Sequence, residues 1–432
     1  MKPLLQERVI DYVEARRDRL VALIGDLVRR PSENMPPNGA EVQCQRYVAS
    51  VLQAAGLEPD IYELDAVPGF AAHPLFAPGR IYRDRPNVVA RMSGGGRGRS
   101  LILSGHIDTV PRGTLPWTRS PFGAQVEGDR LYGRGANDMK AGVAMNLFVM
   151  EAARELKLQP AGDLLFESVV DEEFGGVNGT LAGRLHGDVA DAAIITEPSS
   201  LRICPAQRGG RTAHITFSSR GGVLDGGGAR GRVMDQVTIF LRELDRFAEQ
   251  RRRNCRRHSL YSALADPVPV AITKLTTGPW GTGEPVTLPE ECRVEMYWQL
   301  MPGEEQQEID REFHAWFESM IAAAPEIFLR RPTVEYPIRW LPGSAIEASE
   351  PIVTELSDCA ARVLPAPPLV AGIEGPCDLF VFHAFHIPAV LWGPRGGNTH
   401  GSDEYVELDS VVAATKALLL FVCRWCGMED RR

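Results

Sequence analysis

Leu101-Ile-Leu-Ser-Gly-His-Ile-Asp-Thr-Val-Pro111 is the stretch that decides how this chain is organised. It begins as an apolar run and continues into a polar loop that holds His106 and Asp108. A short apolar run that stops at turn residues is typical of a strand buried in a parallel sheet. Ligands bind beyond the carboxyl ends of such strands, so functional side chains are expected in this loop.

Other apolar runs of the same kind occur along the chain. They are Asn87 to Ala90, Asp163 to Val170, Ala192 to Ile195 and Ala389 to Trp392. Helical spacing is found at 4–29, before Pro31, at 41–55, which Gly56 closes, and at 141–155. The alternation predicts an α/β fold, with a mainly parallel sheet flanked by helices.

The pattern changes at about residue 208. An alternating strand at 212–218 is followed by a helix at 233–251, a strand at 292–300 and a helix at 306–323. This content predicts a small α+β domain inserted into the larger one. The predicted boundaries are 1–207 and 328–432 for the larger domain and 208–327 for the insertion.

A glycine-rich segment, Gly221 to Gly231, lies inside the insertion. It lacks the Lys-Ser/Thr pair of a phosphate-binding P-loop and the glycine spacing of a dinucleotide fold. We interpret it as a flexible loop.

Composition excludes several classes of protein. The 432 residues are 44% hydrophobic and carry a net charge of −9, which disfavours nucleic acid and anionic membranes as partners. The one basic run, at 251–258, follows a helical pattern and is interpreted as a solvated helix end. No uncharged apolar stretch approaches the roughly 18 residues needed to span a bilayer.

The charged first 19 residues contain no apolar core of a signal peptide, so we expect a cytoplasmic protein. Its eight cysteines are scattered, and reduced thiols are expected. Cys423 and Cys426 form a lone CxxC in an apolar stretch, which favours buried packing over a redox or zinc motif.

Two polar segments contain candidate metal ligands in the first half of the chain. In extended backbone, residues two apart face the same side, so Asp108 can fix one ring nitrogen of a ligand His106. Asp138 lies in a glycine-rich turn before a helix. Its carboxylate can bridge two cations, although a helix cap is the alternative.

Four more candidates follow three later strands. Glu172 and Glu173 come after the run that ends at Val170, Glu197 follows Ile195, and His400 follows the last strand. One carboxylate of the adjacent pair can bind a cation while the other stays free as a base. His106, Asp138, Glu173, Glu197 and His400 together suit two Zn²⁺ ions, with Co²⁺ or Mn²⁺ as alternatives.

In order and wording, these motifs resemble the family of acetylornithine deacetylase, succinyl-diaminopimelate desuccinylase, aminoacylase and glutamate carboxypeptidase. These are co-catalytic zinc amidohydrolases of the metallopeptidase type. The resemblance covers nearly the whole chain. It implies a catalytic metal-binding domain, an inserted lid or dimerisation domain, and a homodimer formed through that insertion.

The resemblance also implies a role for each candidate. His106 and Glu197 would hold one ion, and Glu173 and His400 the other. Asp138 would bridge the ions and Asp108 would orient His106. Glu172 would be the general base that takes a proton from the attacking water.

Two family features are missing. A histidine expected in the insertion, in a Gly-x-x-x-His stretch, is absent from 218–228. His214, Arg220, Arg230 or Arg232 could replace it, although His214 suits an ordinary strand position. Where many relatives have a substrate-binding arginine, this chain has Tyr297-Trp298-Gln299.

The missing arginine leaves two interpretations of the substrate. Either the substrate lacks a free α-carboxylate, or another group of this chain, such as Arg395, binds that carboxylate. Trp298 is also suited to packing inside the insertion.

Three hypotheses about function follow. The first is a hydrolase that cleaves the amide bond of a small N-acyl amino acid or related compound. The second is a hydrolase of an aromatic or heterocyclic amine or amide without a free α-carboxylate. The third is a non-catalytic metal-binding relative, which the presence of Glu172 disfavours.

Overall fold

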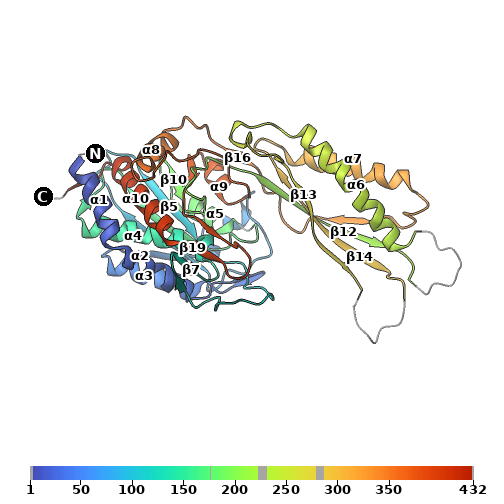
Figure 1. The fold of residues 1–432 in the computed structure, drawn as a ribbon, viewed down its shortest axis with the longest axis horizontal. Coiled ribbons are helices and arrows are strands. Elements are labelled where there is room, and N and C mark those ends of the chain that lie inside the picture. The colour runs from blue at the N-terminus through green and yellow to red at the C-terminus, as the bar shows by residue number, and fades with distance from the viewer. Residues whose placement is uncertain (1–2, 176, 222–230, 279–286, 431–432) are drawn as a thin grey trace. The chain divides into compact units, whose positions relative to one another are not determined.

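The computed structural model describes residues 3–175, 177–221, 231–278 and 287–430 (Figure 1). The chain forms two compact units. The first comprises Met1–Ala206, Ala345–Ile373 and Cys377–Arg432, and the second comprises Gln207–Ser344 and Glu374–Pro376. The chain enters the second unit within β11 (Ala206–Gln207) and leaves it within β16 (Ser344–Ala345).

The first unit is built on a six-stranded sheet of order β17-β10-β5-β9-β4-β3. Its strands are β3 (Asp60–Glu63), β4 (Pro86–Met92), β5 (Leu101–His106), β9 (Leu164–Val169), β10 (Ala193–Ile195) and β17 (Ala389–Leu391). The four strands from β17 to β9 are parallel, whereas β4 and β3 pair antiparallel. Every side chain of β5 is buried, as expected for a strand covered on both faces.

Helices cover this sheet. They are α1 (Pro3–Ala15), α2 (Arg17–Val28), α3 (Val42–Ala54), α4 (Ala141–Glu155), α5 (Asn178–His186), α8 (Pro351–Ala360), α9 (Leu379–Ala384) and α10 (Leu408–Trp425). Helix α4 packs on β5 and β9, and α2, α3 and α10 pack on α4. Leu379 and Phe382 of α9 join Ile102 of β5 in a separate apolar cluster.

Short elements border the sheet. They are β1 (Asn34–Met35), β2 (Asn38–Gly39), η1 (Leu64–Ala66), η2 (Phe70–Ala72), β6 (Gln125–Glu127), β7 (Arg130–Tyr132), η3 (Ala136–Lys140), β8 (Leu158–Gln159), β18 (Gly396–Gly397), β19 (Tyr405–Glu407) and β20 (Glu429–Asp430). Strands β6, β7, β19 and β18 form a small antiparallel sheet, which links the segments that carry Asp138 and His400.

The second unit is an antiparallel sheet of order β13-β14-β12-β15 with two long helices. Its elements are β12 (Gly209–Ser218), α6 (Val233–Asn254), η4 (Ser259–Tyr261), β13 (Val270–Thr277), β14 (Glu291–Leu300), α7 (Gln306–Ala323) and β15 (Thr333–Glu335). Alternate residues of β14 are buried, and these pack with apolar residues of α6 and α7. The period of two places Trp298 in this core, where it is 0% exposed.

The α/β class predicted from the sequence is confirmed, and each predicted strand and helix has a counterpart. Residues 328–344, which were predicted to belong to the larger domain, lie in the second unit because β15 pairs with β12. The predicted helix at 4–29 is two helices, with a break at Arg16 that neither proline nor glycine marks. Most of the glycine-rich segment, 222–230, lies outside the described residues.

The basic run lies at the end of α6, as predicted, and Arg253, Arg256 and Arg257 are exposed, but Arg251 is only 1% exposed. Its guanidinium lies 2.8 Å from Glu304 and 2.7 Å from Glu312. Because α6 continues to Asn254, this arginine faces Glu304, which precedes α7, and Glu312, which lies within α7, rather than water.

Two expectations about the interior agree with the structure. Cys423 and Cys426 are buried, and all eight cysteines, each of which is described, are thiols rather than disulfides. Among the described helices, none combines the length and apolar character needed to cross a bilayer.

Candidate metal centre

The parallel part of the sheet brings the candidate ligands together. His106 ends β5, Glu173 follows β9, and Glu197 follows β10. These strands are neighbours, so their carboxyl ends meet at one edge. His400 reaches the same edge in the loop between β18 and β19, and Asp138 lies in the turn η3 before α4.

The Asp138 carboxylate lies between the two histidines. His106 Nε2 is 3.1 Å from Asp138 Oδ1, and His400 Nε2 is 3.2 Å from Asp138 Oδ2. Each histidine also has its own glutamate. His106 Nε2 lies 3.3 Å from Glu197 Oε1, and His400 Nε2 lies 3.0 Å from Glu173 Oε2. The five donors therefore form two groups of three that share one carboxylate.

These separations fit metal ligation. Nitrogen and oxygen ligands lie about 2.0–2.2 Å from a tetrahedral zinc ion, so neighbouring ligands are roughly 3.3–3.5 Å apart. The donor pairs in this site are separated by 3.0–3.3 Å, slightly less than that spacing. His106, Asp138 and Glu173 also form a group of donor atoms within 4.8 Å of one another. The residues present fit two divalent cations.

The electrostatics of the site favour positive charge. Burial and the nearby Asp138 raise the pKa of Glu173 to about 7 and that of Glu197 to about 8. Burial opposes protonation of His400, but hydrogen bonds with Asp138 and Glu173 raise its pKa to about 11. The two glutamates and the imidazole thus bind protons more tightly than usual, whereas hydrogen bonds with both histidines lower the pKa of Asp138 despite its burial. Divalent cations would satisfy the same demand for positive charge.

Asp108 lies behind His106. The ring Nδ1 is 2.9 Å from the backbone carbonyl oxygen of Asp108 and 3.6 Å from its carboxylate Oδ1. The nearer acceptor for the ring is therefore the carbonyl. The carboxylate itself accepts hydrogen bonds from the backbone N–H groups of Glu172 and Glu173. That Asp108 orients His106 stays a prediction, to which the structure adds a contact with the acidic turn.

Glu172 is placed by its backbone, because its N–H donates to Asp108. Burial raises the pKa of the Glu172 side chain well above its ordinary value, against the attraction of His106. A carboxyl group with a raised pKa beside a group of possible metal ligands is a candidate for acid–base catalysis.

Sequence reasoning missed the group that fixes the Asp138 turn. The buried Glu404 accepts hydrogen bonds from the backbone N–H groups of Gly135, Asn137 and Asp138. It also pairs with the buried Arg134 at 2.6 Å. Arg134 stands four residues before Asp138 and Glu404 four residues after His400, but only their pairing across 270 positions distinguishes them from ordinary loop charges.

A second missed residue is Asp378, which is 2% exposed and precedes α9. Thr180 Oγ1 donates a hydrogen bond to its carboxylate. Nothing in the spacing of Pro376-Cys-Asp378 indicated a buried acid at this position.

Two of the residues considered as replacements for the missing family features, His214 and Arg395, already have partners, whereas Arg230 lies outside the described residues. In β12, His214 lies 2.8 Å from Glu295, as suits an ordinary strand histidine. Gln299 donates to the carbonyl of Glu374, and Arg395 pairs with Glu407 at 3.0 Å. Trp298 packs between apolar rings of the second unit. None of the three residues Tyr297 to Gln299 supplies a cation.

Comparisons with known proteins identify the family of the chain. The model of a family described as Peptidase family M20/M25/M40 matches residues 102–424. An N-formyl-4-amino-5-aminomethyl-2-methylpyrimidine deformylase of Halalkalibacterium halodurans is 28% identical, and the match covers 98% of each chain. A succinyl-diaminopimelate desuccinylase of Cereibacter sphaeroides is 29% identical over 90% of this chain and 94% of its own.

Solved structures share the fold. Human carnosine dipeptidase 1 has a TM-score of 0.73 and 15% identity, and the match covers 98% of this chain and 100% of that one. The di-peptidase Dug1p from Saccharomyces cerevisiae has a TM-score of 0.75 and 12% identity, with 98% of each chain covered.

Proposed function

This chain belongs to peptidase family M20/M25/M40, and from that premise we propose how it acts as a metal-dependent hydrolase of small amides. One ion would be held by His106 and Glu197, and the other by Glu173 and His400, with Asp138 shared between them. The observation that carries this assignment is the pair of histidines on opposite oxygens of one buried aspartate. The donors suit zinc, and cobalt or manganese are alternatives.

The chemistry divides between the ions and the chain. When bound, two such cations lower the pKa of water and polarise the substrate carbonyl. Glu172 takes a proton from the attacking water and later delivers it to the leaving nitrogen. Asp108 holds the backbone of Glu172 and Glu173 in place, and Glu404 holds the Asp138 turn. With a base in this position and hydrolases among its full-length relatives, the chain is an enzyme rather than a non-catalytic relative.

For the substrate, we propose an N-acyl derivative of a heteroaromatic amine without an α-carboxylate. The stretch Tyr297 to Gln299 has no cation to bind a carboxylate, and the Gln299 amide already donates to Glu374. The match to a deformylase of an N-formyl aminopyrimidine, over 98% of each chain, supports the same class.

We expect N-formyl-4-amino-5-aminomethyl-2-methylpyrimidine to be hydrolysed with a kcat/KM that is tenfold to a hundredfold higher than the kcat/KM for N-acetyl amino acids. A hydrogen bond to a charged group contributes about 1.5–3 kcal/mol, which corresponds to that ratio. Steady-state assays with both compounds on the zinc-loaded enzyme measure it. Turnover of N-acyl amino acids alone would contradict the proposal.

An N-acyl amino acid remains the second candidate. The desuccinylase of Cereibacter sphaeroides, 29% identical over most of both chains, favours it. In that case the substrate carboxylate needs a cation outside the Tyr297 to Gln299 stretch. N-succinyl-diaminopimelate is the compound that tests this candidate in the same assay.

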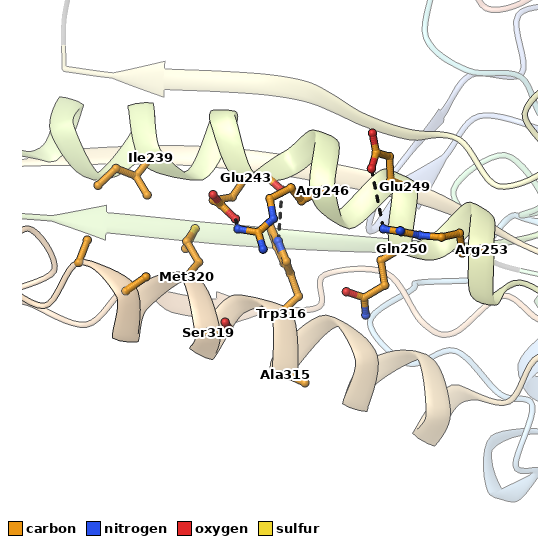
Figure 2. Close-up of a pocket in the computed structure, with 12 residues that line it drawn as sticks. Ile239, Glu243, Arg246, Glu249, Gln250, Arg253, Ala315, Trp316, Ser319 and Met320 are labelled. Atoms are coloured by element: carbon orange, nitrogen blue, oxygen red, sulfur yellow. Dashed lines mark hydrogen bonds and ion pairs between the residues drawn. The ribbon is translucent and has the colours of Figure 1, made fainter.

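We propose a homodimer formed through the second unit. Strand β13 lies at one edge of its sheet, and an open strand edge can pair with a second chain. Helix α6 presents alternating charges beside a groove of about 530 Å³ between α6 and α7 (Figure 2). When α6 is set antiparallel to a second copy, Glu243 faces Arg253 and Arg246 faces Glu249, so the surface is complementary to itself.

Leu275 on β13 is 41% exposed and offers a test of the dimer. In sedimentation analysis, we expect the wild-type protein to have twice the mass of one chain. We expect Leu275→Arg to raise the dissociation constant of the dimer at least tenfold. A charge buried between two strands lacks a partner, which accounts for the expected weakening. Leu329→Arg, at a residue 69% exposed in the same unit, is the control and leaves the dimer intact. A monomeric wild-type chain would refute the proposal.

We also propose that the protein works in the cytoplasm. Its eight cysteines, each within the described residues, are thiols, which suits a reducing compartment. Fractionation of the native cells, with the thiols quantified in the isolated protein, tests this location.

A further inference from the structure

Asn34 lies between two carboxylates behind the metal centre. It begins β1 and is completely buried. Its Nδ2 lies 2.9 Å from Asp108 Oδ2 and 3.2 Å from Asp171 Oδ1. A side-chain amide has two N–H donors, so each carboxylate can accept one of them.

The two carboxylates belong to different halves of the site. Asp108 follows His106 at the end of β5, and its backbone carbonyl contacts the ring of His106. Asp171 begins the acidic turn after β9, directly before Glu172 and Glu173. One side-chain amide therefore joins the segment that carries a ligand of the first ion to the segment that carries a ligand of the second.

Asp171 is firmly held on its other side. Tyr82 donates a hydrogen bond to its Oδ2, and Arg80 Nε lies 3.2 Å from its Oδ1. Its backbone φ of +63° is in the left-handed region, which aspartate tolerates better than most residues other than glycine. The residue at the start of the turn that carries Glu172 and Glu173 is therefore held in place by its side-chain contacts.

Asn34 itself is attached to the His106 segment. Its backbone N–H donates to the carbonyl of Thr109 at 2.8 Å, and Glu33 forms a parallel bridge with Thr109. The side chain thus reaches from a backbone tied to the β5 loop across to the turn after β9. A change that removes the amide takes away both N–H donors, one from each buried carboxylate.

We propose that Asn34 is a positioning residue that sets the distance between the two halves of the metal site. The inference rests on the proposed function, because it concerns the same two ions. It assigns to β1 a role in metal affinity, although no residue of β1 is among the five donors. Outer residues that orient ligands typically change metal affinity by about tenfold to a hundredfold when they are replaced.

The test compares Asn34→Ala and Asn34→Asp with Asn38→Ala, an exposed asparagine in the same β1–β2 hairpin. Each metal-free protein is titrated with Co²⁺ and followed by its visible absorption spectrum and by calorimetry. We expect Asn34→Ala to weaken Co²⁺ binding tenfold to a hundredfold and to alter the spectrum. Asn34→Asp, which adds a third carboxylate, weakens binding further, and Asn38→Ala matches the wild type.

The outcomes separate the two proposals. A wild-type protein that binds no Co²⁺ would overturn the proposed function itself. Wild-type binding of two ions, with the same affinity and spectrum in both Asn34 variants, would overturn the positioning role alone. A lower melting temperature of the metal-free Asn34→Ala protein with unchanged Co²⁺ binding would also overturn it, because Asn34 would then only support the fold.

Discussion

Replacement of Glu172 by glutamine lowers kcat by about a thousandfold, while two zinc ions stay bound. Glutamine has nearly the same shape but cannot accept a proton, and general acid–base catalysis contributes about 10²–10⁴ to the rate. The ligands are unchanged, since Glu172 is not among the five donors. Single-turnover kinetics, together with zinc analysis of the same sample, measure both effects.

The control is Glu347→Gln, an exposed acid in the same unit, which leaves kcat unchanged. The two variants also differ in stability when the metal is removed. Burial raises the pKa of Glu172, so its ionised form destabilises the folded metal-free protein as the pH rises above the unfolded value of about 4.5. Glu172→Gln therefore unfolds at a higher temperature than the wild type at pH 7. Loss of zinc together with activity in this variant would count against its assignment as the base.

Asp138→Ala removes both ions and reduces hydrolysis to background. Its two oxygens face different histidines, so the substitution takes one ligand from each group of three. Metal analysis after dialysis is expected to give about two zinc ions per wild-type chain and nearly none in the variant. The background rate is measured against the same substrate without enzyme.

Glu173→Ala is the matched comparison. It removes a donor from the His400 group only, so one ion remains with His106 and Glu197. Loss of both ions in Asp138→Ala and of one in Glu173→Ala would support the shared role of Asp138. Two ions retained in Asp138→Ala would exclude it.

The parallel core could be predicted because its signal is local. A buried strand is a short apolar run, and His106, Glu173 and Glu197 each stand directly after such a run. Neighbouring parallel strands place their carboxyl ends at one edge, so three candidates needed no further information to be brought together. His400 lies farther from its strand, and the recognised motif rather than periodicity selected it.

The supporting residues could not be predicted, because their partners are distant in sequence. Glu404 is fixed by Arg134 across 270 positions, and Asn34 reaches Asp171 across 137. The predicted boundary at residue 328 comes before β15, because a strand of three residues is too short to show an alternation of apolar and polar residues. The burial of Arg251 also depended on acids that follow it by more than fifty residues.

The order of strands in the large sheet has a consequence for how the protein is made. Strand β10 pairs with β17 on its outer side, and the whole second unit lies between them in the chain. During synthesis, the edge of β10 therefore stays open until almost the entire chain has left the ribosome, and open edges invite pairing between molecules. His400 emerges later still, so the second group of donors is complete only after β17 can cover the edge of β10.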